Sequence, residues 1–365
     1  MAQALRIGVN ALYLIPGGVG GTEIYLRNLL KALAQVDSVN EYFVFTNRET
    51  SSDLVPSRPN FTQLKQLIPA RVRPLRILWE QTALPVAVRR YRIDVMFNPG
   101  FTCPLWRECP NVTVFHDLQH KRHPEYFRWF DLPFWKMLLW GAARRSDGII
   151  SVSEATRKDL QSYYGVNSTV IHHGVEAEFF EIAKQRAPAD YLLCVSTLHP
   201  HKNLERLLRV HGQTPELPNL VLTGLKGFAA DQIEKLANSR VRVTGWVPRA
   251  ELLELFRHAR GFIYPSTFEG FGMPVLEAMA AGVPLACSDI PPLREIADGC
   301  AIFFDPLVDE QLKDALLTLI RYGSPVESAR QRAGLSSWEA CAQSSLACLT
   351  SAATSAPLAK EARLR

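Results

Sequence analysis

The sequence lacks several patterns that would place it in common classes of protein. None of its seven cysteines belongs to a C-x-x-C pair, which excludes the usual zinc-ribbon and thioredoxin-type sites. No apolar run of about 18 residues occurs without charges, so we expect no membrane-spanning helix. No D-x-D pair is present, which removes the commonest way of holding Mg²⁺ on a diphosphate. We therefore expect neither a cofactor nor a metal.

Two further absences bear on location and partners. No apolar core followed by a cleavage site stands near the N-terminus, where residues 6–12 are typical of a strand, and several cysteines lie in apolar runs as free thiols. We therefore expect a cytoplasmic protein. The net charge is only +5 and no known nucleic-acid motif accompanies it, so nucleic acid is not an expected partner.

What the sequence does contain is a regular alternation of apolar strands and helical segments. At 365 residues with 47% hydrophobic content, the chain is long enough for two domains. Nearly continuous apolar strands predict parallel sheets covered on both faces, hence two doubly wound α/β domains. The expected strands are RIGVNAL, YFVFTN, IDVMFNP, NVTVFHD, GIISVS and TVIHHG, then YLLCVST, NLVLTG, VRVTGW, GFIYPS, PLACSD and AIFFDP.

A charged, proline-containing segment at residues 181–191 indicates the boundary between the two domains. We expect a first domain at 1–184 and a second at 185–335. Residues 336–365 are expected to form a helix, with Ser336 or Ser337 as its N-cap and a frayed tail from Pro357.

Positive charge is concentrated in two segments. Residues 71–92 hold six arginines and one acid, and residues 127–145 interleave aromatic with basic side chains. One interpretation makes these ordinary helices whose aromatic residues join the core. The other makes them a surface for anionic lipid head groups, with peripheral contact at the cytoplasmic face of the inner membrane.

The stretch PSTFEGFGMPVLEAMAAGVP (265–284) holds the densest chemistry. Ligands of open parallel sheets bind beyond the carboxyl ends of the strands, and Gly270, Phe271 and Gly272 form a turn there. Pro274 is expected at the first position of the following helix, whose N-terminus suits a phosphate. The side chains expected to face the same ligand are Glu269, Glu277, Lys202 and His201.

Other polar residues follow other strands. In the first half they include the glycine loop at 17–21, His116 with Asp117, and Ser153. His116, His120 and His123 also raise the alternative of a metal site, but their spacing resembles no standard ligand set. The glycine loop lacks G-x-G-x-x-G spacing, so a dinucleotide site is only weakly supported.

These stretches together resemble one family, the retaining glycosyltransferases of the GT-B fold, family 4. The similarity covers GGVGGTEIYLRNLLKAL, GVEAEFF, HPHKNLERLL, FEGFGMPVLEAMAAGVPLACSDIPPLREIADG and the SSWEACA helix. Its most specific element is E-x7-E, Glu269 with Glu277. The resemblance implies two Rossmann-like domains facing across a cleft, the first binding the acceptor and the second the nucleotide sugar, with the final helix returning to the first.

The resemblance also implies roles. Glu269 would bind hydroxyls of the donor sugar, Glu277 the nucleotide ribose, and Lys202 would neutralise the diphosphate, with His116 beside the sugar as a further catalytic residue. The backbone of residues 271–275 would hold phosphate oxygens. The donor-binding residues would be His201, Gly245, Trp246, Val247, Gly270, Phe271, Gly272, Met273, Pro274, Val275 and Glu277. The residues that border the donor and the acceptor would be Gly17, Gly18, Asp117 and Ser153.

One departure from the family pattern concerns charge. Where many members have an arginine before the lysine, this chain reads VSTLHPHK, so we expect His201 to supply part of the charge and to make donor binding depend on pH near neutrality. The segment HDLQHKRHPEYF is similar to bacterial polysaccharide and O-antigen mannosyltransferases. The implied donor is GDP-mannose and the acceptor a glycan or lipid-linked glycan of cell-surface polysaccharide or lipopolysaccharide.

Several alternatives stay open from the sequence. The same fold could use a UDP-sugar or a nucleotide-activated deoxysugar. More distant alternatives are a nucleotide-cofactor oxidoreductase, which would need a dinucleotide fingerprint, and a non-enzymatic sugar-binding protein of the periplasmic kind, which the missing signal peptide disfavours.

Overall fold

The chain folds into two compact α/β units. We describe residues 4–18 and 20–363 of a computed structural model of the protein, with side chains to residue 355. The first unit comprises the chain up to Gly174 together with the helix from Trp338, and the second comprises Val175–Ser337. The boundary thus falls at Gly174 rather than at residue 184. The reason is that helix α6 (Ala177–Ala183) packs on helices of the second unit.

The first unit is built on seven parallel strands in the order β3-β2-β1-β4-β5-β6-β7. The strands are β1 (Arg6–Ala11), β2 (Glu41–Thr46), β3 (Phe61–Lys65), β4 (Val95–Asn98), β5 (Asn111–Phe115), β6 (Gly148–Ser151) and β7 (Thr169–Val170). The residues of β1, β2 and β5 form almost continuous buried runs because helices cover both faces of the sheet.

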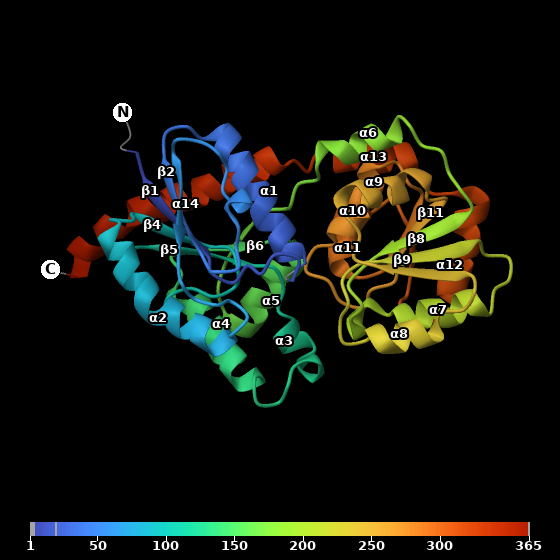
Figure 1. Ribbon diagram of the computed structural model, residues 1–365, viewed down its shortest axis with the longest axis horizontal. Helices are drawn as coiled ribbons and strands as arrows, with labels where there is room; N and C mark the ends of the chain where they lie inside the picture. The colour runs from blue at the N-terminus through green and yellow to red at the C-terminus, as the bar shows by residue number, and fades with distance from the viewer. Residues whose placement is uncertain (1–3, 19, 364–365) are drawn as a thin grey trace. The chain divides into compact units, whose positions relative to one another are not determined.

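The helices of the first unit are α1 (Gly21–Val36), α2 (Arg73–Arg90), α3 (Gln119–Arg122), α4 (Leu132–Arg145), α5 (Glu154–Tyr164) and α14 (Trp338–Arg363), with 3-10 turns at Ser52–Leu54 and Pro124–Tyr126. Figure 1 shows α1 and α14 on one side of this sheet and α2, α4 and α5 on the other. The C-terminal helix α14 packs on α1 and on β4, β5 and β6, so the expected return to the first domain is confirmed. It extends to Arg363, past Pro357, where the sequence favours a frayed tail; residues 364–365 lie outside the described part.

The second unit has six parallel strands in the order β10-β9-β8-β11-β12-β13. They are β8 (Tyr191–Val195), β9 (Asn219–Thr223), β10 (Val241–Gly245), β11 (Gly261–Tyr264), β12 (Leu285–Ser288) and β13 (Ile302–Phe304), and all six were expected from the sequence. Both sheets therefore follow the doubly wound order in which the chain starts at the centre and reverses direction once.

Helices of the second unit also form two layers. They are α6, α7 (Leu204–Gly212), α8 (Ala230–Leu236), α9 (Arg249–His258), α10 (Met273–Ala280), α11 (Pro291–Ala297), α12 (Asp309–Tyr322) and α13 (Val326–Ala333), with a 3-10 turn at Pro200–Lys202. Apolar residues of α7, α8 and α12 share one core with the sheet. On the other layer α10 contacts α6, α11 and α13. Among the described helices none is long and apolar enough to cross a bilayer.

Candidate functional site

The chemistry predicted from the sequence gathers at the carboxyl edge of the second sheet. Strands β8 and β11 are neighbours there although β9 and β10 separate them in sequence, because the strand order reverses between them. The loop after β8 carries Lys202, and the loop after β11 carries Glu269. This reversal point is where open α/β sheets bind ligands, since the two loops diverge and leave the strand ends accessible.

Hydrogen bonds fix these two loops to each other. The carbonyl oxygen of His201 accepts from Thr267 N at 2.8 Å and from Ser266 Oγ at 3.1 Å. Asn203, in a left-handed conformation with φ of 56°, donates from Nδ2 to the carbonyl oxygens of Pro265 at 3.1 Å and Pro306 at 2.7 Å. The backbone on either side of Lys202 is therefore tied to the segment that leads to Glu269.

Lys202 and Glu269 form a buried ion pair. Nζ lies 2.6 Å from Glu269 Oε1, and the side chains are only 12% and 10% exposed. Lys202 Nζ also donates to the hydroxyl of Tyr264 at 3.2 Å. Burial would raise the pKa of Glu269, but the charges of Lys202 and His201 hold it below its ordinary value, so Glu269 is ionised near neutral pH.

Tyr264 was not among the residues singled out from the sequence. It is the last residue of β11, it is fully buried, and burial first and then the charge of Glu269 raise the pKa of its hydroxyl well above the ordinary value. A neutral phenol is thus held beside Lys202. Its position at the end of the strand next to the reversal point is the signal that could have identified it.

The turn into α10 depends on Gly272. This residue has φ of 112°, a conformation that residues with a side chain rarely adopt, and a Cβ there would lie 2.5 Å from Leu293 Cδ2. Both the backbone conformation and the lack of space therefore favour glycine. We expected Pro274 at the first position of this helix, but the helix begins at Met273, which places Pro274 second. Proline is tolerated there as well, because the first N–H groups of a helix have no intrahelical acceptor. Of the amides expected to hold phosphate, that of Val275 donates to Gly272 O at 3.0 Å.

Glu277 lies one turn into α10 and is 5% exposed. Burial and, less strongly, the nearby charge of Glu176 raise its pKa, Arg249 acts in the opposite direction, and the resulting pKa is about 8. Arg249 is bound to Glu176 at 2.9 Å and stacks on the ring of Phe179 at 4.4 Å. Glu277 is therefore protonated at neutral pH, in contrast to Glu269, and its carboxyl can both donate and accept hydrogen bonds.

Gly245 is the last residue of β10, two strands away from β8 along the same edge, and Trp246 and Val247 follow it. Gly245 has φ of 70°, and its carbonyl oxygen accepts from Gly224 N at 2.9 Å. The indole of Trp246 is 63% exposed. The structure thus brings Lys202, Glu269 and the start of α10 together and leaves this segment at a separate position on the sheet edge.

The glycine loop of the first unit follows β1 at the reversal point of the first sheet. Gly17 and Gly18 are exposed, Gly17 has φ of 69°, and its N–H donates to Glu23 Oε2 at 2.8 Å. Glu23 also binds Arg27 at 2.8 Å. The loop therefore presents accessible backbone, while its acid is engaged inside the unit. Val19 lies outside the described residues.

His116, Asp117 and Ser153 stand at the ends of β5 and β6. His116 is 7% exposed, its Nε2 lies 2.8 Å from Pro99 O, and burial lowers its pKa to about 4, so the ring is neutral at pH 7. Asp117 accepts from Gln119 N at 2.9 Å, and Ser153 Oγ accepts from Thr156 N at 3.1 Å as the N-cap of α5. Ser153 thus has a structural bond that its position in the sequence did not reveal.

The alternative of a metal at His116, His120 and His123 finds no geometric support. His120 Nε2 lies 2.6 Å from the hydroxyl of Tyr164, and His123 Nδ1 lies 2.9 Å from Glu125 Oε1. Across the part of the chain that the structure describes, no three His, Cys, Asp or Glu side chains converge as metal ligands would.

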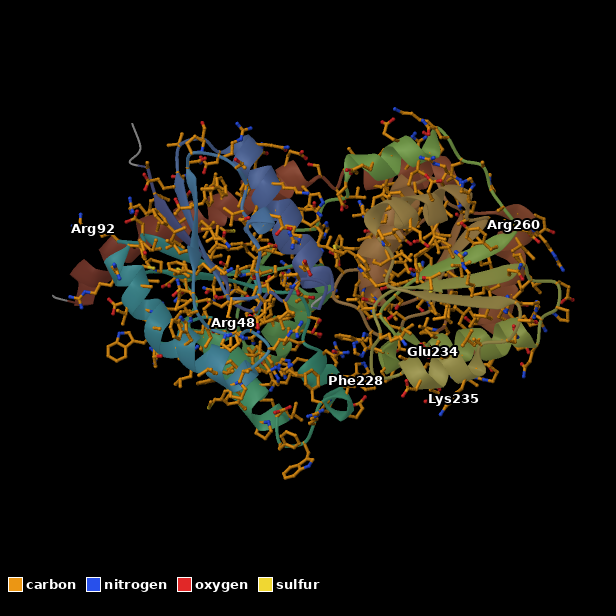
Figure 2. The ribbon with its side chains drawn as sticks, viewed as in Figure 1. Arg48, Arg92, Phe228, Glu234, Lys235 and Arg260 are labelled. Carbon is orange, nitrogen blue, oxygen red and sulfur yellow. The ribbon has the colours of Figure 1, made fainter. Side chains whose placement is uncertain are left out.

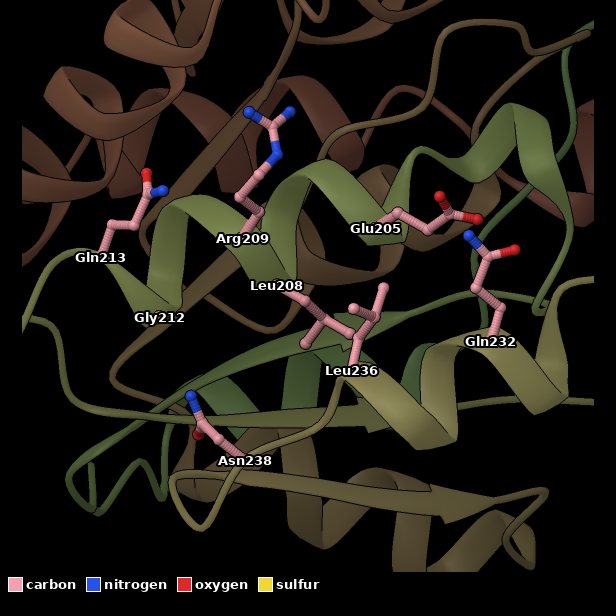
Figure 3. Close-up of a pocket in the computed structure, with 8 residues that line it drawn as sticks. All are labelled: Glu205, Leu208, Arg209, Gly212, Gln213, Gln232, Leu236 and Asn238. Atoms are coloured by element: carbon pink, nitrogen blue, oxygen red, sulfur yellow. The ribbon is translucent and has the colours of Figure 1, made fainter.

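A hollow on the outer layer of the second unit lies away from this edge (Figure 3). It is lined by residues of α7, α8 and the segments directly after each helix: Glu205, Leu208, Arg209, Gly212, Gln213, Gln232, Leu236 and Asn238. It contains none of the residues predicted to bind a ligand.

Comparison with known proteins places this geometry in a family. The family model "Glycosyl transferases group 1" matches residues 175–334, and the model "Glycosyltransferase Family 4" matches residues 19–179. The two models adjoin near Gly174, where the structure divides the chain, and together they span most of it.

Individual relatives agree with this assignment. The chain is 27% identical to the O-antigen chain mannosyltransferase B of Escherichia coli over 87% of this chain and 92% of the relative. It is 26% identical to the O-antigen chain mannosyltransferase RfbU of Salmonella typhimurium over 68% and 71%. The crystal structure of Anabaena HepE in complex with UDP and glucose superposes with a TM-score of 0.72 at 19% identity, over 95% of this chain and all of that one. The chain therefore belongs to the group 1, family 4 glycosyltransferases of the GT-B fold, and it is an enzyme of that class.

Proposed function

We propose that this chain is a retaining glycosyltransferase that moves a hexose from a nucleotide diphosphate sugar to a glycan or lipid-linked glycan in cell-surface polysaccharide or lipopolysaccharide biosynthesis. Mannose from GDP-mannose is the donor we favour, because the two relatives above are named O-antigen mannosyltransferases. The observation that carries the proposal is the buried ion pair of Lys202 with Glu269 at the β8/β11 reversal point, in the segment that leads into α10 at Met273.

The reaction requires stabilisation of a leaving group. The bond between C1 of the sugar and the diphosphate oxygen breaks, its electron pair stays on that oxygen, and the acceptor hydroxyl oxygen forms the new bond to C1. Lys202 and the N-terminal end of α10 would stabilise the negative charge that grows on the diphosphate. The departing phosphate oxygen would take the acceptor proton on the same face, so that no separate base and no metal is needed.

The two carboxyl groups would have different tasks in this scheme. Glu269, ionised and bound to Lys202, would accept hydrogen bonds from hydroxyls of the donor sugar. Glu277, buried and protonated, would meet the ribose hydroxyls at the other end of the donor. His201, Gly245 and Trp246 would complete the donor contacts. Different protonation states of two nearby carboxyls support different roles rather than an acid–base pair.

We propose that the first unit binds the acceptor. Gly17 and Gly18 offer exposed backbone at the reversal point of the first sheet, and His116 and Asp117 follow β5 at the same edge. His116 would act as a neutral imidazole, because burial keeps its pKa near 4. A lipid-linked acceptor would also require contact between the protein and the cytoplasmic face of the inner membrane.

A UDP-sugar is the second donor candidate, because the similar structure of HepE holds UDP and glucose. A thermal-shift screen of the purified protein with GDP, UDP and NAD distinguishes the candidates, since a ligand that binds only the native state raises the midpoint of unfolding. Stabilisation by GDP supports GDP-mannose as the donor. Stabilisation by UDP alone would favour a UDP-sugar in its place. Stabilisation by NAD alone would contradict the proposed function.

A further inference from the structure

Helix α4 presents an apolar stripe to solvent. Phe134, Met137 and Trp140 follow one another at three-residue spacing and are 40%, 55% and 53% exposed. Just before the helix, Trp129 is 84% exposed and its ring lies edge-on to that of Phe130. The opposite side of α4 is buried in the core with β5 and α5. The aromatic residues of this segment are thus only partly core residues, and one face of the helix remains uncovered.

Helix α2 has a second exposed stripe. Leu75, Leu78 and Val86 are 42%, 58% and 68% exposed, and Thr82 lies between them at helical spacing. The buried side of α2 carries Leu84 and Val88, which pack on the first sheet. An amphipathic helix of a globular protein normally points charged side chains outward, so exposed leucine and valine at this spacing need a different explanation.

Contacts through the loop between β4 and β5 link the two helices that carry these stripes. Gln81 of α2 donates to Cys103 O at 3.0 Å and accepts from Leu105 N at 2.9 Å, which ties α2 to the loop before β5. Leu105 in turn packs on Gly141 of α4, where a Cβ would lie 2.8 Å from its side chain. The guanidinium of Arg73, the first residue of α2, stacks on Trp135 of α4 at 5.2 Å.

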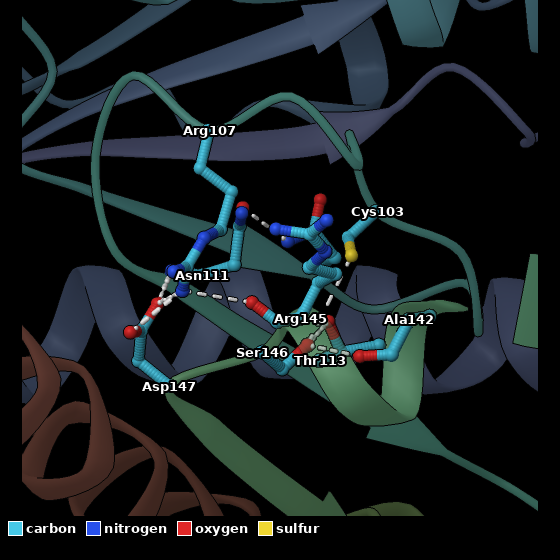
Figure 4. Close-up of polar contacts among 9 residues, drawn as sticks. Cys103, Arg107, Asn111, Thr113, Ala142, Arg145, Ser146 and Asp147 are labelled. Atoms are coloured by element: carbon cyan, nitrogen blue, oxygen red, sulfur yellow. Dashed lines mark hydrogen bonds and ion pairs between the residues drawn. The ribbon is translucent and has the colours of Figure 1, made fainter. Parts of the chain in front are cut away.

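The loop between the helices is itself fixed and carries another exposed aromatic. Arg107 donates to the carboxylate of Asp147 at 2.7 Å and to Arg145 O at 2.9 Å, as Figure 4 shows. Its neighbour Trp106 is 73% exposed. The indole is therefore held at the surface by an anchored backbone.

The same surface is basic. Exposed cations on the two helices are Arg73, Arg89, Arg90, Lys136, Arg144 and Arg145. Figure 2 marks a further arginine, Arg92, just beyond the end of α2. Helix α4 contains no acidic residue, and the single acid of α2, Glu80, is 1% exposed with its carboxylate bonded to Thr102 Oγ1. Exposed apolar side chains on these two helices are thus mixed with positive charge, and acids just outside the helices include Asp131 before α4 and Glu108 in the loop.

We propose that the exposed faces of α2 and α4, with Trp106 between them, dock on an anionic phospholipid bilayer. Apolar side chains of such a surface enter the boundary between head groups and acyl chains, and arginine and lysine attract the anionic head groups. The positive charge selects this occupant over a second copy of the chain, because two identical basic faces repel each other. The docking surface is inferred from exposure and charge alone. The inference rests on the proposed function only where it identifies the bilayer as the place at which the enzyme meets a lipid-linked acceptor.

Co-sedimentation of the full-length protein with vesicles tests the proposal. The probes are vesicles of phosphatidylglycerol with phosphatidylethanolamine, and vesicles of phosphatidylcholine alone. One variant removes the apolar stripe (Phe134→Ser, Met137→Ser, Trp140→Ser), and one removes charge (Arg89→Gln, Arg90→Gln, Lys136→Gln). A matched control changes an exposed cation and an exposed aromatic of α12 in the second unit, Arg321→Gln with Tyr322→Ser, where Tyr322 is 83% exposed.

We expect the wild type and the control to bind the anionic vesicles, and each surface variant to bind at least about tenfold more weakly. Absence of wild-type binding, equal binding by the variants, or a dimer in light scattering that the apolar variant converts to monomer would overturn the proposal. Vesicle binding needs no nucleotide, so its failure is distinguishable from failure of the proposed reaction. Unchanged stabilisation of all variants by GDP shows that their fold and donor site are intact.

Discussion

The ammonium of Lys202 and the carboxylate of Glu269 lie 2.6 Å apart in a site where both side chains are nearly buried. They come from loops after two adjacent strands, β8 and β11, and Tyr264 contacts the ammonium as well. A diphosphate that binds Lys202 would therefore share a cation that Glu269 already neutralises. The sequence suggested separate roles for these residues, and the geometry makes them one unit.

Lys202→Ala should destabilise the protein because it leaves the carboxylate of Glu269 buried without its partner. We expect the free energy of unfolding to fall by about 3–5 kcal/mol, as for other broken buried pairs. The double variant Lys202→Ala with Glu269→Gln should recover most of this loss, since no charge is then left uncompensated. Urea unfolding of the two variants checks this, and equal losses in both would show that the ion pair is not coupled.

Glu277 should make stability depend on pH. Its pKa is about 8 in the folded protein against 4.5 in the unfolded chain, so the folded state binds the proton more tightly. The stabilisation from this group is complete below about pH 4.5 and is lost as pH rises to about 8. Glu277→Gln cannot ionise, so its stability relative to wild type should increase across that window. Unfolding curves between about pH 5 and 9 measure it, and a constant difference would contradict the assigned burial effect.

Gly272 and Gly299 provide a matched pair of substitutions. Both have positive φ, 112° and 72°, but a Cβ at Gly272 would meet Leu293 at 2.5 Å whereas nothing lies within 4 Å at Gly299. Gly299→Ala should cost about 1 kcal/mol of stability from the backbone alone. Gly272→Ala should cost about 1–3 kcal/mol more, because overpacking is added to the same strain. Comparable thermal midpoints for the two variants would be inconsistent with the turn described before α10.

His201 gives a prediction about donor affinity. Its carbonyl ties the loops of the site together, and its ring stacks on His199 with centroids 5.8 Å apart, next to Lys202. If protonated imidazole supplies the charge that the family pattern assigns to an arginine, affinity for GDP should fall as pH rises from about 6 to 8. His201→Gln should weaken the affinity at the lower pH and flatten the profile. Identical profiles for variant and wild type would refute this role.

The fold was largely predictable because buried parallel strands leave a strong sequence signal. Five of the six strands of the second sheet contain apolar runs, β10 alternates valine with Arg242 and Thr244, and each of the six was located. Strand β3 was missed because it is an edge strand, and its residues Thr62 to Lys65 are exposed or half-buried, with Leu64 the one apolar side chain among them. The boundary at Gly174 was missed because α6 precedes the proline-containing segment yet packs against α9 and α10.

The candidate site was predictable in its residues and not in its contacts. Strand ends and the glycine turn identified Lys202, Glu269 and Glu277, because strand order alone brings these positions to one edge. The ion pair between Lys202 and Glu269 and the phenol of Tyr264 depend on the loop conformation that His201 O and Asn203 fix. The same holds for α2 and α4, where only the structure shows which face of each helix is uncovered.

Calorimetric titration with GDP and UDP tests the donor site most directly. The proteins compared are the wild type, Lys202→Ala, and the double variant Lys202→Ala with Glu269→Gln. The double variant separates loss of the cation from loss of stability. We expect the wild type to bind at least one of the two nucleotides, and both variants to bind it at least about tenfold more weakly, because a hydrogen-bonded charge contact to the diphosphate is lost. Binding by the variants that equals that of the wild type would contradict the placement of the diphosphate at Lys202 and the start of α10.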